Sequence, residues 1–157
     1  MTGASIVCIQ ETKLSVVTLS IVMETLGTEF DGYFCLPAIG TRGGIIIAWV
    51  GTMVRLENAH VDVNSVTAKV IPVCEGPCWW LTGVYGPQED EAKVAFLAEM
   101  RNVHSTRLGP WMLCGDFNMI YRDEDKNNDN QNRRMMGRLR RFLSDCEIGR
   151  ASCRERV

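Results

Sequence analysis

The alternation of apolar and polar residues along the chain predicts seven short strands. Continuous apolar or β-branched runs indicate strands buried on both faces, whereas alternating runs indicate strands with one buried face. The predicted strands are residues 6–9, 33–36, 43–49, 53–60, 65–73, 79–85 and 111–114. The Glu-Gly-Pro sequence at 75–77 predicts a turn, so strands 65–73 and 79–85 are expected to form a hairpin.

Apolar residues that recur every three or four positions predict three helices. The first is expected near residues 16–26, with Ser15 as its N-cap and Gly27 at its end. The second opens with acidic residues at 89–91, and the third spans 133–146. The predicted buried residues are Val16, Leu19, Met23 and Leu26 in the first helix, Phe96, Leu97, Met100 and Val103 in the second, and Met135, Leu139, Phe142 and Cys146 in the third.

The order of these elements predicts a mixed α/β layered domain. Five predicted strands follow one another between residues 33 and 85 with no helix among them. This excludes the strict strand–helix alternation of a doubly wound nucleotide-binding fold, and no glycine-rich phosphate loop is present in the sequence.

Composition and charge narrow the class of protein. Hydrophobic residues make up 46% and charged residues 23% of the 157 residues, which is typical of a folded domain and excludes a disordered, collagen-like or coiled-coil chain. The longest uncharged apolar stretch, residues 43–54, is too short to cross a bilayer, and no secretory signal precedes it. Seven scattered cysteines fit a reduced, intracellular protein. A net charge of −2 provides no global attraction to nucleic acid.

Polar residues that follow two predicted strands are candidates for chemistry. Glu11 follows strand 6–9, and Asp116 follows strand 111–114 with Asn118 two residues later. Carboxylates are suitable ligands for Mg²⁺, and an Asp–x–Asn pair can handle a water and a phosphate oxygen. Structural roles remain open, because Glu11 can sit in a solvated loop and Gly-Asp-Phe-Asn can form an Asx turn. From the chemistry alone, these structural roles are favoured.

Four motifs occur in a recognisable order: Ile-Gln-Glu-Thr-Lys at 9–13, Gly-Gly at 43–44, Gly-Val-Tyr-Gly-Pro at 83–87 and Gly-Asp-Phe-Asn at 115–118. In order and spacing they resemble the endonuclease/exonuclease/phosphatase superfamily, and most closely the endonuclease domain of plant-type LINE (non-LTR) retrotransposons. The resemblance extends from residue 5 to about residue 146. It changes the balance between the structural and the functional interpretations in favour of the latter.

The resemblance implies a four-layer α/β (α+β) sandwich of two mixed sheets packed face to face with outer helices. It implies that Glu11 binds Mg²⁺ or Mn²⁺, that Tyr85 contacts the scissile phosphate, and that Asp116 and Asn118 orient the attacking water and hold the phosphate. The implied reaction is hydrolysis of a DNA phosphodiester, which nicks a target site for retrotransposition. The implied partners are the DNA phosphate backbone and a reverse transcriptase domain of the full-length polyprotein. A nuclear location is expected, and no membrane association.

The chain also departs from this family. Family domains begin with a strand that carries an Asn and end with an Asp-His pair whose His is central to catalysis, and neither has a match here. His60 and His104 lie in a predicted strand and a predicted helix, away from any matching motif. We therefore expect the chain as written to be close to inactive. Two alternatives are a non-catalytic remnant of a decayed retroelement and a related phosphatase or abasic-site nuclease.

The C-terminal residues resemble a sequence of different origin. From Glu147 onward the chain matches, residue for residue, the translation of a common sequencing-library adapter. We therefore predict a partial domain over residues 1–147, truncated at both ends, and a non-native tail over residues 148–157. Just before this tail, Arg134, Arg138 and Arg141 share one face of the predicted third helix. They fit either a DNA-phosphate contact or, as we favour from the sequence, an ordinary solvated face.

Overall fold

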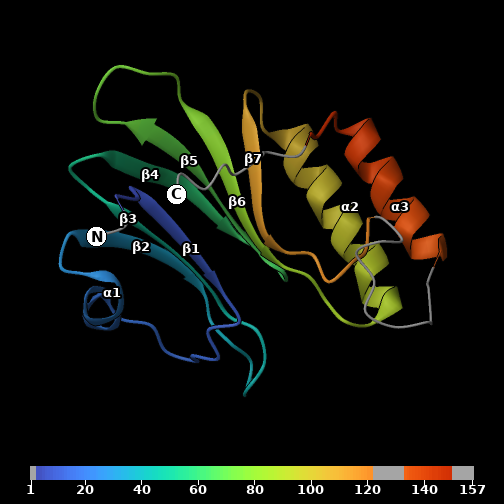
Figure 1. The fold of residues 1–157 in the computed structure, drawn as a ribbon, viewed down its shortest axis with the longest axis horizontal. Coiled ribbons are helices and arrows are strands. Elements are labelled where there is room, and N and C mark those ends of the chain that lie inside the picture. Colours follow the sequence, from blue (N-terminus) through green and yellow to red (C-terminus); the bar gives the residue numbers. More distant parts are fainter. Residues whose placement is uncertain (1–2, 122–132, 150–157) are drawn as a thin grey trace, which may run out of the picture. The chain divides into compact units, whose positions relative to one another are not determined.

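The computed structural model describes residues 3–121 and 133–149. The chain forms two compact units, Met1–Asn118 and Met119–Val157. The first unit contains all the described strands and two helices, and the second contains the third described helix (Figure 1). The helices are α1 (Leu19–Leu26), α2 (Asp90–Thr106) and α3 (Arg133–Asp145).

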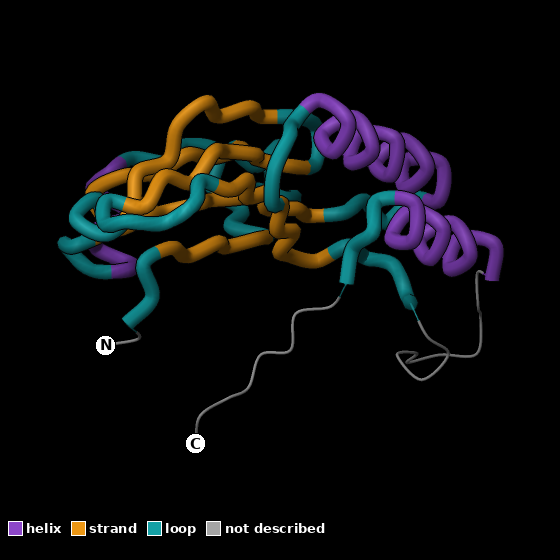
Figure 2. Tube along the Cα trace, turned by 90° about the horizontal axis from the view of Figure 1, so that it is seen from above, coloured by secondary structure: helices purple, strands orange, loops and turns teal. Residues whose placement is uncertain are grey.

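The strands of the first unit form two sheets. The first sheet has the order β1-β3-β2 with antiparallel neighbours, and the second has the order β4-β5-β6-β7, in which only β6 and β7 run parallel. Figure 2 shows the strands of both sheets, in orange, grouped together within the first unit. The strand bounds are β1 (Ile6–Gln10), β2 (Phe30–Leu36), β3 (Ile45–Val50), β4 (Val54–Val61), β5 (Ser65–Pro72), β6 (Trp79–Tyr85) and β7 (Trp111–Asp116).

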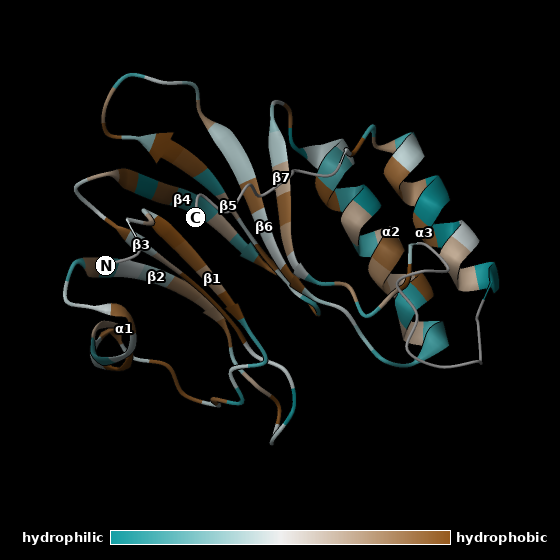
Figure 3. Cartoon of the chain, viewed as in Figure 1, coloured by the Kyte–Doolittle hydropathy of each residue, from teal (hydrophilic) through white to brown (hydrophobic). Residues whose placement is uncertain are grey.

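The main hydrophobic core lies between the two sheets. Alternate residues of β3, Ile45 and Ile47, are fully buried against β5 and β6, which contribute Val66, Ala68 and Leu81 to the same cluster. The intervening residues of β3 face the opposite side, where α1 packs. Because both faces of β3 are covered, this strand is apolar at successive positions, as the hydropathy colouring in Figure 3 shows.

Helix α1 covers the outer face of the first sheet, but its start and its buried face differ from the sequence prediction. Thr18, and not Ser15, is the N-cap, and its hydroxyl accepts a hydrogen bond from the first helical turn. Val22 is the buried residue of this helix, whereas Val16 lies before it and is 67% exposed. The helix begins three residues later than predicted, so Leu19 is also exposed; Gly27 does end it.

Helix α2 covers the outer face of the second sheet. Phe96, Leu97, Met100 and Val103 are buried, as predicted from their spacing. The Phe96 ring lies 5.6 Å from that of Phe117, just after β7. The layers of the first unit are therefore helix, sheet, sheet and helix, which confirms the predicted sandwich; the first sheet is purely antiparallel over its described strands.

A buried polar cluster lies between the second sheet and its outer layer. The hydroxyls of Thr67 and Thr82 are 2.9 Å apart, and the Trp111 indole N–H donates to the Thr82 hydroxyl at 2.8 Å. Both threonines are fully buried on the face of the sheet opposite to Val66 and Ala68. These hydrogen bonds satisfy polar groups that would otherwise be unpaired away from water.

The second unit is described around α3. One face of this helix is buried through the residues predicted from the sequence, with Met136 in addition. The Arg140 guanidinium donates from Nε to the Tyr121 carbonyl at 2.8 Å and lies over the Tyr121 ring. The predicted domain boundary at residue 147 stays a prediction, and residues 150–157 of the predicted tail lie outside the described residues.

Over the described parts of the chain, every helix is too short or too polar to cross a membrane.

We expect Thr82→Val to destabilise the fold more than Thr67→Val does. Loss of the Thr82 hydroxyl leaves both the Thr67 hydroxyl and the Trp111 N–H buried without a partner. Each unsatisfied group costs about 1–3 kcal/mol, so with two such groups the unfolding free energy should fall by about 2–6 kcal/mol. Thr67→Val leaves the bond from Trp111 intact and serves as the matched control. Equal losses in urea unfolding would contradict this account.

Candidate active site

Glu11 lies in a tight turn directly after β1. Its φ is 54°, a conformation that non-glycine residues rarely adopt. The turn is tied to the start of β3 by hydrogen bonds from Thr12 N to Gly44 O at 3.3 Å and from Lys13 N to Gly43 O at 3.0 Å. Gly44 has φ 96°, and a Cβ there would collide with the Thr12 side chain. The Gly-Gly motif thus allows the close approach that holds Glu11 in place.

Tyr85 and Asp116 are brought side by side by the parallel pairing of β6 and β7. They are register partners at the ends of these strands. Register partners point to the same face of a sheet, with strands about 4.8 Å apart. Gly115, with φ 127°, is required here because a Cβ would strike the Val84 carbonyl. Tyr85 and Asp116 therefore end neighbouring strands side by side, and Tyr85 packs against the core between the two sheets.

Asn118 fixes the orientation of Asp116. The Asn118 backbone N–H donates to Asp116 Oδ1 at 2.8 Å, which is an Asx turn, and the Asn118 amide donates from Nδ2 to Gly86 O at 2.6 Å. Asp116 O in turn accepts from Gly86 N at 2.7 Å. The structural role considered for this motif is therefore present, and it positions Asp116. One N–H of the Asn118 amide has no partner in these bonds and remains available to a ligand.

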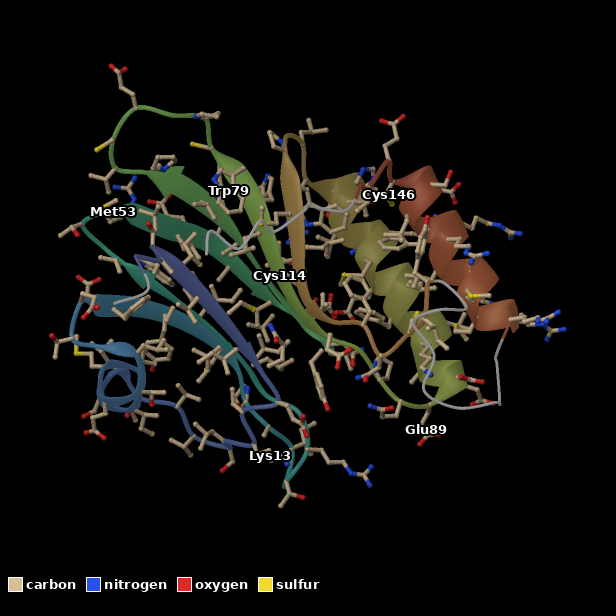
Figure 4. All side chains as sticks on the ribbon, viewed as in Figure 1. Lys13, Met53, Trp79, Glu89, Cys114 and Cys146 are labelled. Carbon is tan, nitrogen blue, oxygen red and sulfur yellow. The ribbon has the colours of Figure 1, made fainter. Side chains whose placement is uncertain are left out.

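A cleft of about 660 Å³ opens at this end of the sheets, and both Glu11 and Tyr85 line it. Its walls also carry Lys13, Arg42 and Glu89. Figure 4 shows Lys13 and Glu89 at the same end of the first unit. Asp116 and Asn118 are not among the residues that line the cleft; they are joined to it through Gly86, which lines it. The structure thus places two of the four predicted site residues in one cleft, and the other two beside it.

Backbone strain is concentrated around this cleft. Among the described residues, five non-glycine residues have a positive φ, and three of them are Glu11, Lys13 and Asn118. Such conformations are retained where surrounding contacts enforce them, and they cluster at functional sites. The strain here is enforced by the hydrogen bonds from Thr12, Lys13 and Asn118.

Two carboxylates line the cleft, Glu11 and Glu89, and the motif resemblance assigns a divalent cation to Glu11. Glu11 is exposed, and its carboxylate is 3.5 Å from the Lys13 ammonium. No group of three or more His, Cys, Asp or Glu residues is arranged to hold a metal among the described residues. Mg²⁺ is commonly held by one or two carboxylates while waters and substrate phosphate oxygens complete its coordination. Glu11 fits such a role, which stays a prediction.

Neither histidine belongs to the cleft. His60 is exposed and its Nε2 lies 3.4 Å from Asp62 Oδ2, while the His104 ring packs 5.6 Å from the Trp111 ring. Neither lines the cleft. The described residues therefore place no imidazole where it could protonate a leaving group in the cleft.

Comparison with solved structures identifies the fold. An AP endonuclease, LMAP, from Leishmania major superposes with a TM-score of 0.64 at 16% identity and is matched over 92% of this chain and 58% of that protein. The human Nocturnin catalytic domain gives a TM-score of 0.52 at 16% identity and is matched over 92% of this chain and 57% of that protein. ANGEL2, a 2′,3′-cyclic phosphatase, gives a TM-score of 0.52 at 19% identity and is matched over 74% of this chain and 40% of that protein.

The chain has the endonuclease/exonuclease/phosphatase fold. It spans 40–58% of the length of these three proteins. No protein-family model matches the sequence, and no curated protein matches it.

Sequence reasoning missed two residues that shape the cleft of this endonuclease/exonuclease/phosphatase-fold chain. Asn64, in the turn between β4 and β5, lines the cleft, and its carbonyl accepts from Tyr85 N at 3.0 Å. Glu99 on α2 accepts from Ser65 Oγ at 2.6 Å and from Asn64 N at 3.3 Å. The available signal was an acidic residue on the apolar face of a helix, between Phe96 and Val103.

Burial raises the pKa of the Glu99 carboxyl above the ordinary glutamate value, and the nearby negative charge of Asp62 raises it further. Hydrogen bonds donated by Ser65 and Asn64 oppose this shift. Folding therefore makes the Glu99 carboxyl easier to protonate than a solvated glutamate.

This shift predicts a specific pH dependence of stability. Because the pKa of Glu99 is higher in the folded than in the unfolded state, the folded state binds a proton more readily. The unfolding free energy contributed by Glu99 therefore rises as pH falls from neutral through the folded pKa, and it is lost as pH rises. Urea unfolding against pH should show wild type gaining stability relative to Glu99→Gln on acidification. Exposed Glu91, replaced by Gln, is the matched control; parallel wild-type and Glu99→Gln curves would contradict the prediction.

Proposed function

We propose that this chain is part of a metal-dependent DNA endonuclease, of the type that nicks target DNA for LINE retrotransposition. The observation that carries the proposal is the joint placement of Glu11 and Tyr85 in one cleft, with Asp116 in register with Tyr85. The fold supports the class of phosphodiester hydrolysis. The four ordered motifs support the LINE assignment, with DNA and a reverse transcriptase domain of the same polyprotein as partners and a nuclear location.

The proposed roles follow from the positions of these side chains. The Asp116 carboxylate, held by the Asn118 backbone N–H, accepts the proton of the attacking water. The remaining N–H of the Asn118 amide and the Tyr85 side chain hold the phosphate. Glu11 is the carboxylate that would hold Mg²⁺ or Mn²⁺. When bound, this ion supplies positive charge to balance the charge that develops on the phosphate oxygens.

Because no histidine among the described residues lines the cleft, we expect different activities on DNA and on an activated diester. Hydrolysis of DNA requires protonation of a strongly basic alkoxide leaving group, and a positioned acid contributes about 10²–10⁴-fold to such a step. An activated diester with a nitrophenolate leaving group does not need this proton. We therefore propose that the chain cleaves an activated diester measurably while it nicks DNA close to background.

We expect hydrolysis of bis(p-nitrophenyl) phosphate that depends on Mg²⁺ or Mn²⁺. Asp116→Asn should lower this rate by about 10²-fold or more, because it removes the proton acceptor. Glu11→Gln should raise the metal concentration needed for half-maximal rate, because it removes the proposed carboxylate ligand. Nicking of supercoiled plasmid by the unmodified chain should stay near the level without protein.

Glu89→Gln is the matched control, since Glu89 is another exposed carboxylate of the same cleft with no proposed role. It should leave the diester rate unchanged. If the unmodified chain shows no metal-dependent hydrolysis, or if Asp116→Asn retains it, the chain is better described as a non-catalytic remnant. Strong plasmid nicking that Asp116→Asn abolishes would instead contradict the expected weakness on DNA.

A further inference from the structure

Helix α3 concentrates positive charge in a chain that is negative overall. Its 13 residues contain five arginines and one acidic residue, Asp145. The whole chain has a net charge of −2. Clustered arginines along one helix form a local site for anions even where the net charge is unfavourable.

Three of these arginines are free of partners within the described residues. Arg134, Arg138 and Arg141 are exposed, and no hydrogen bond or ion pair engages them there. Arg140 differs, since it is held by the Tyr121 carbonyl and ring. We call Arg134, Arg138 and Arg141 the arginine stripe.

The arginine stripe lies on one side of the helix. At 100° per residue its three members fall within about 60° of one another. The buried residues of α3, such as Met135, Leu139 and Phe142, occupy the other side. Gly137 lies next to the stripe, and no atom lies within 4 Å of where its Cβ would be. The face is therefore open to a partner.

Helix stability does not account for this arrangement. Arg134 and Arg138 are four residues apart and Arg138 and Arg141 are three apart, and like charges at these spacings destabilise a helix. Asp145 is the only acidic residue on α3, and it lies in the last turn. A polyanion bound along the stripe would remove this repulsion.

The arginine stripe is long enough to span several phosphates of one DNA strand. At 1.5 Å per residue, Arg134 and Arg141 are separated by about 10 Å along the helix. Phosphates on one strand of B-DNA advance about 3.4 Å each along the duplex axis. A stripe of this length therefore spans about three such steps, so its three guanidinium groups can reach different phosphates of one backbone, and the guanidinium fork binds phosphate oxygens in a bidentate manner.

We propose that the arginine stripe of α3 docks on the phosphate backbone of duplex DNA, as a contact separate from the cleft residues. The proposal rests on the proposed function in taking DNA as the polymer. It makes no use of the cleft carboxylates, so binding can be measured in the absence of metal ions, where no hydrolysis occurs.

The experiment measures the affinity of the full chain for a fluorescent DNA duplex in EDTA, over a series of salt concentrations. Each phosphate contact contributes about 0.9 to the slope of log affinity against log salt. The triple variant Arg134→Gln, Arg138→Gln, Arg141→Gln should therefore show a slope shallower by about 2.7 than the unmodified chain.

A control of equal net charge separates the stripe from general electrostatics. Arg55→Gln, Lys93→Gln, Arg107→Gln removes three cations that already have partners in Glu57, Asp90 and the Trp80 ring. The control should keep the slope of the unmodified chain. Circular dichroism should show unchanged helix content in both variants.

Three results would overturn the proposal. The first two are equal salt slopes for the stripe variant and the control variant, and a salt slope of the stripe variant equal to that of the unmodified chain. The third is binding of poly-glutamate that is as tight and as dependent on the stripe as binding of the duplex. The last result would assign the stripe to an acidic protein partner. Hydrolysis of the activated diester by the stripe variant should be unchanged. Loss of duplex binding by the stripe variant with diester hydrolysis intact supports the role of the arginine stripe. Absence of diester hydrolysis in the unmodified chain, with stripe-dependent duplex binding intact, counts against the proposed function of the cleft and not against the stripe.

Discussion

The close approach of β6 to β7 is the constraint on which the site depends. Gly115 allows β7 to pass against the Val84 carbonyl, and Gly86 allows the chain after β6 to pass against the Phe117 carbonyl. No other residue type would leave this space without displacing the backbone. As a result, Tyr85 and Asp116 become register partners, and Asn118 bonds to Gly86 O.

The first sheet completes the arrangement from the opposite side. Because β3 is covered on both faces, its start is held firmly, and Gly43 and Gly44 there accept the hydrogen bonds that place Glu11. The two sheets thus contribute different chemistry to one end of the first unit: an exposed carboxylate from β1 and a phenol from β6. Neither sheet alone contains both groups.

Sequence patterns predicted the strands and α2 well because these elements bury large, regularly spaced apolar residues. They failed at the start of α1, where Ser15 and Thr18 are both good caps and only packing of Val22 against the sheet chooses between them. The motifs named Glu11, Tyr85, Asp116 and Asn118, but they carried no information on Asn64 or Glu99. Those two act through contacts between segments far apart in the chain, and the one local sign of them is the acidic residue Glu99 among the apolar residues of α2.

The central claim is that the cleft holds a divalent ion beside a phosphodiester. The most direct test is line broadening by Mn²⁺ in the amide NMR spectrum of the chain, in excess dimethyl phosphate. The account predicts broadening centred on residues 11–13, 43–44 and 85–86, lost in Glu11→Gln and retained in Glu89→Gln. Broadening centred elsewhere, or unchanged in Glu11→Gln, would contradict it.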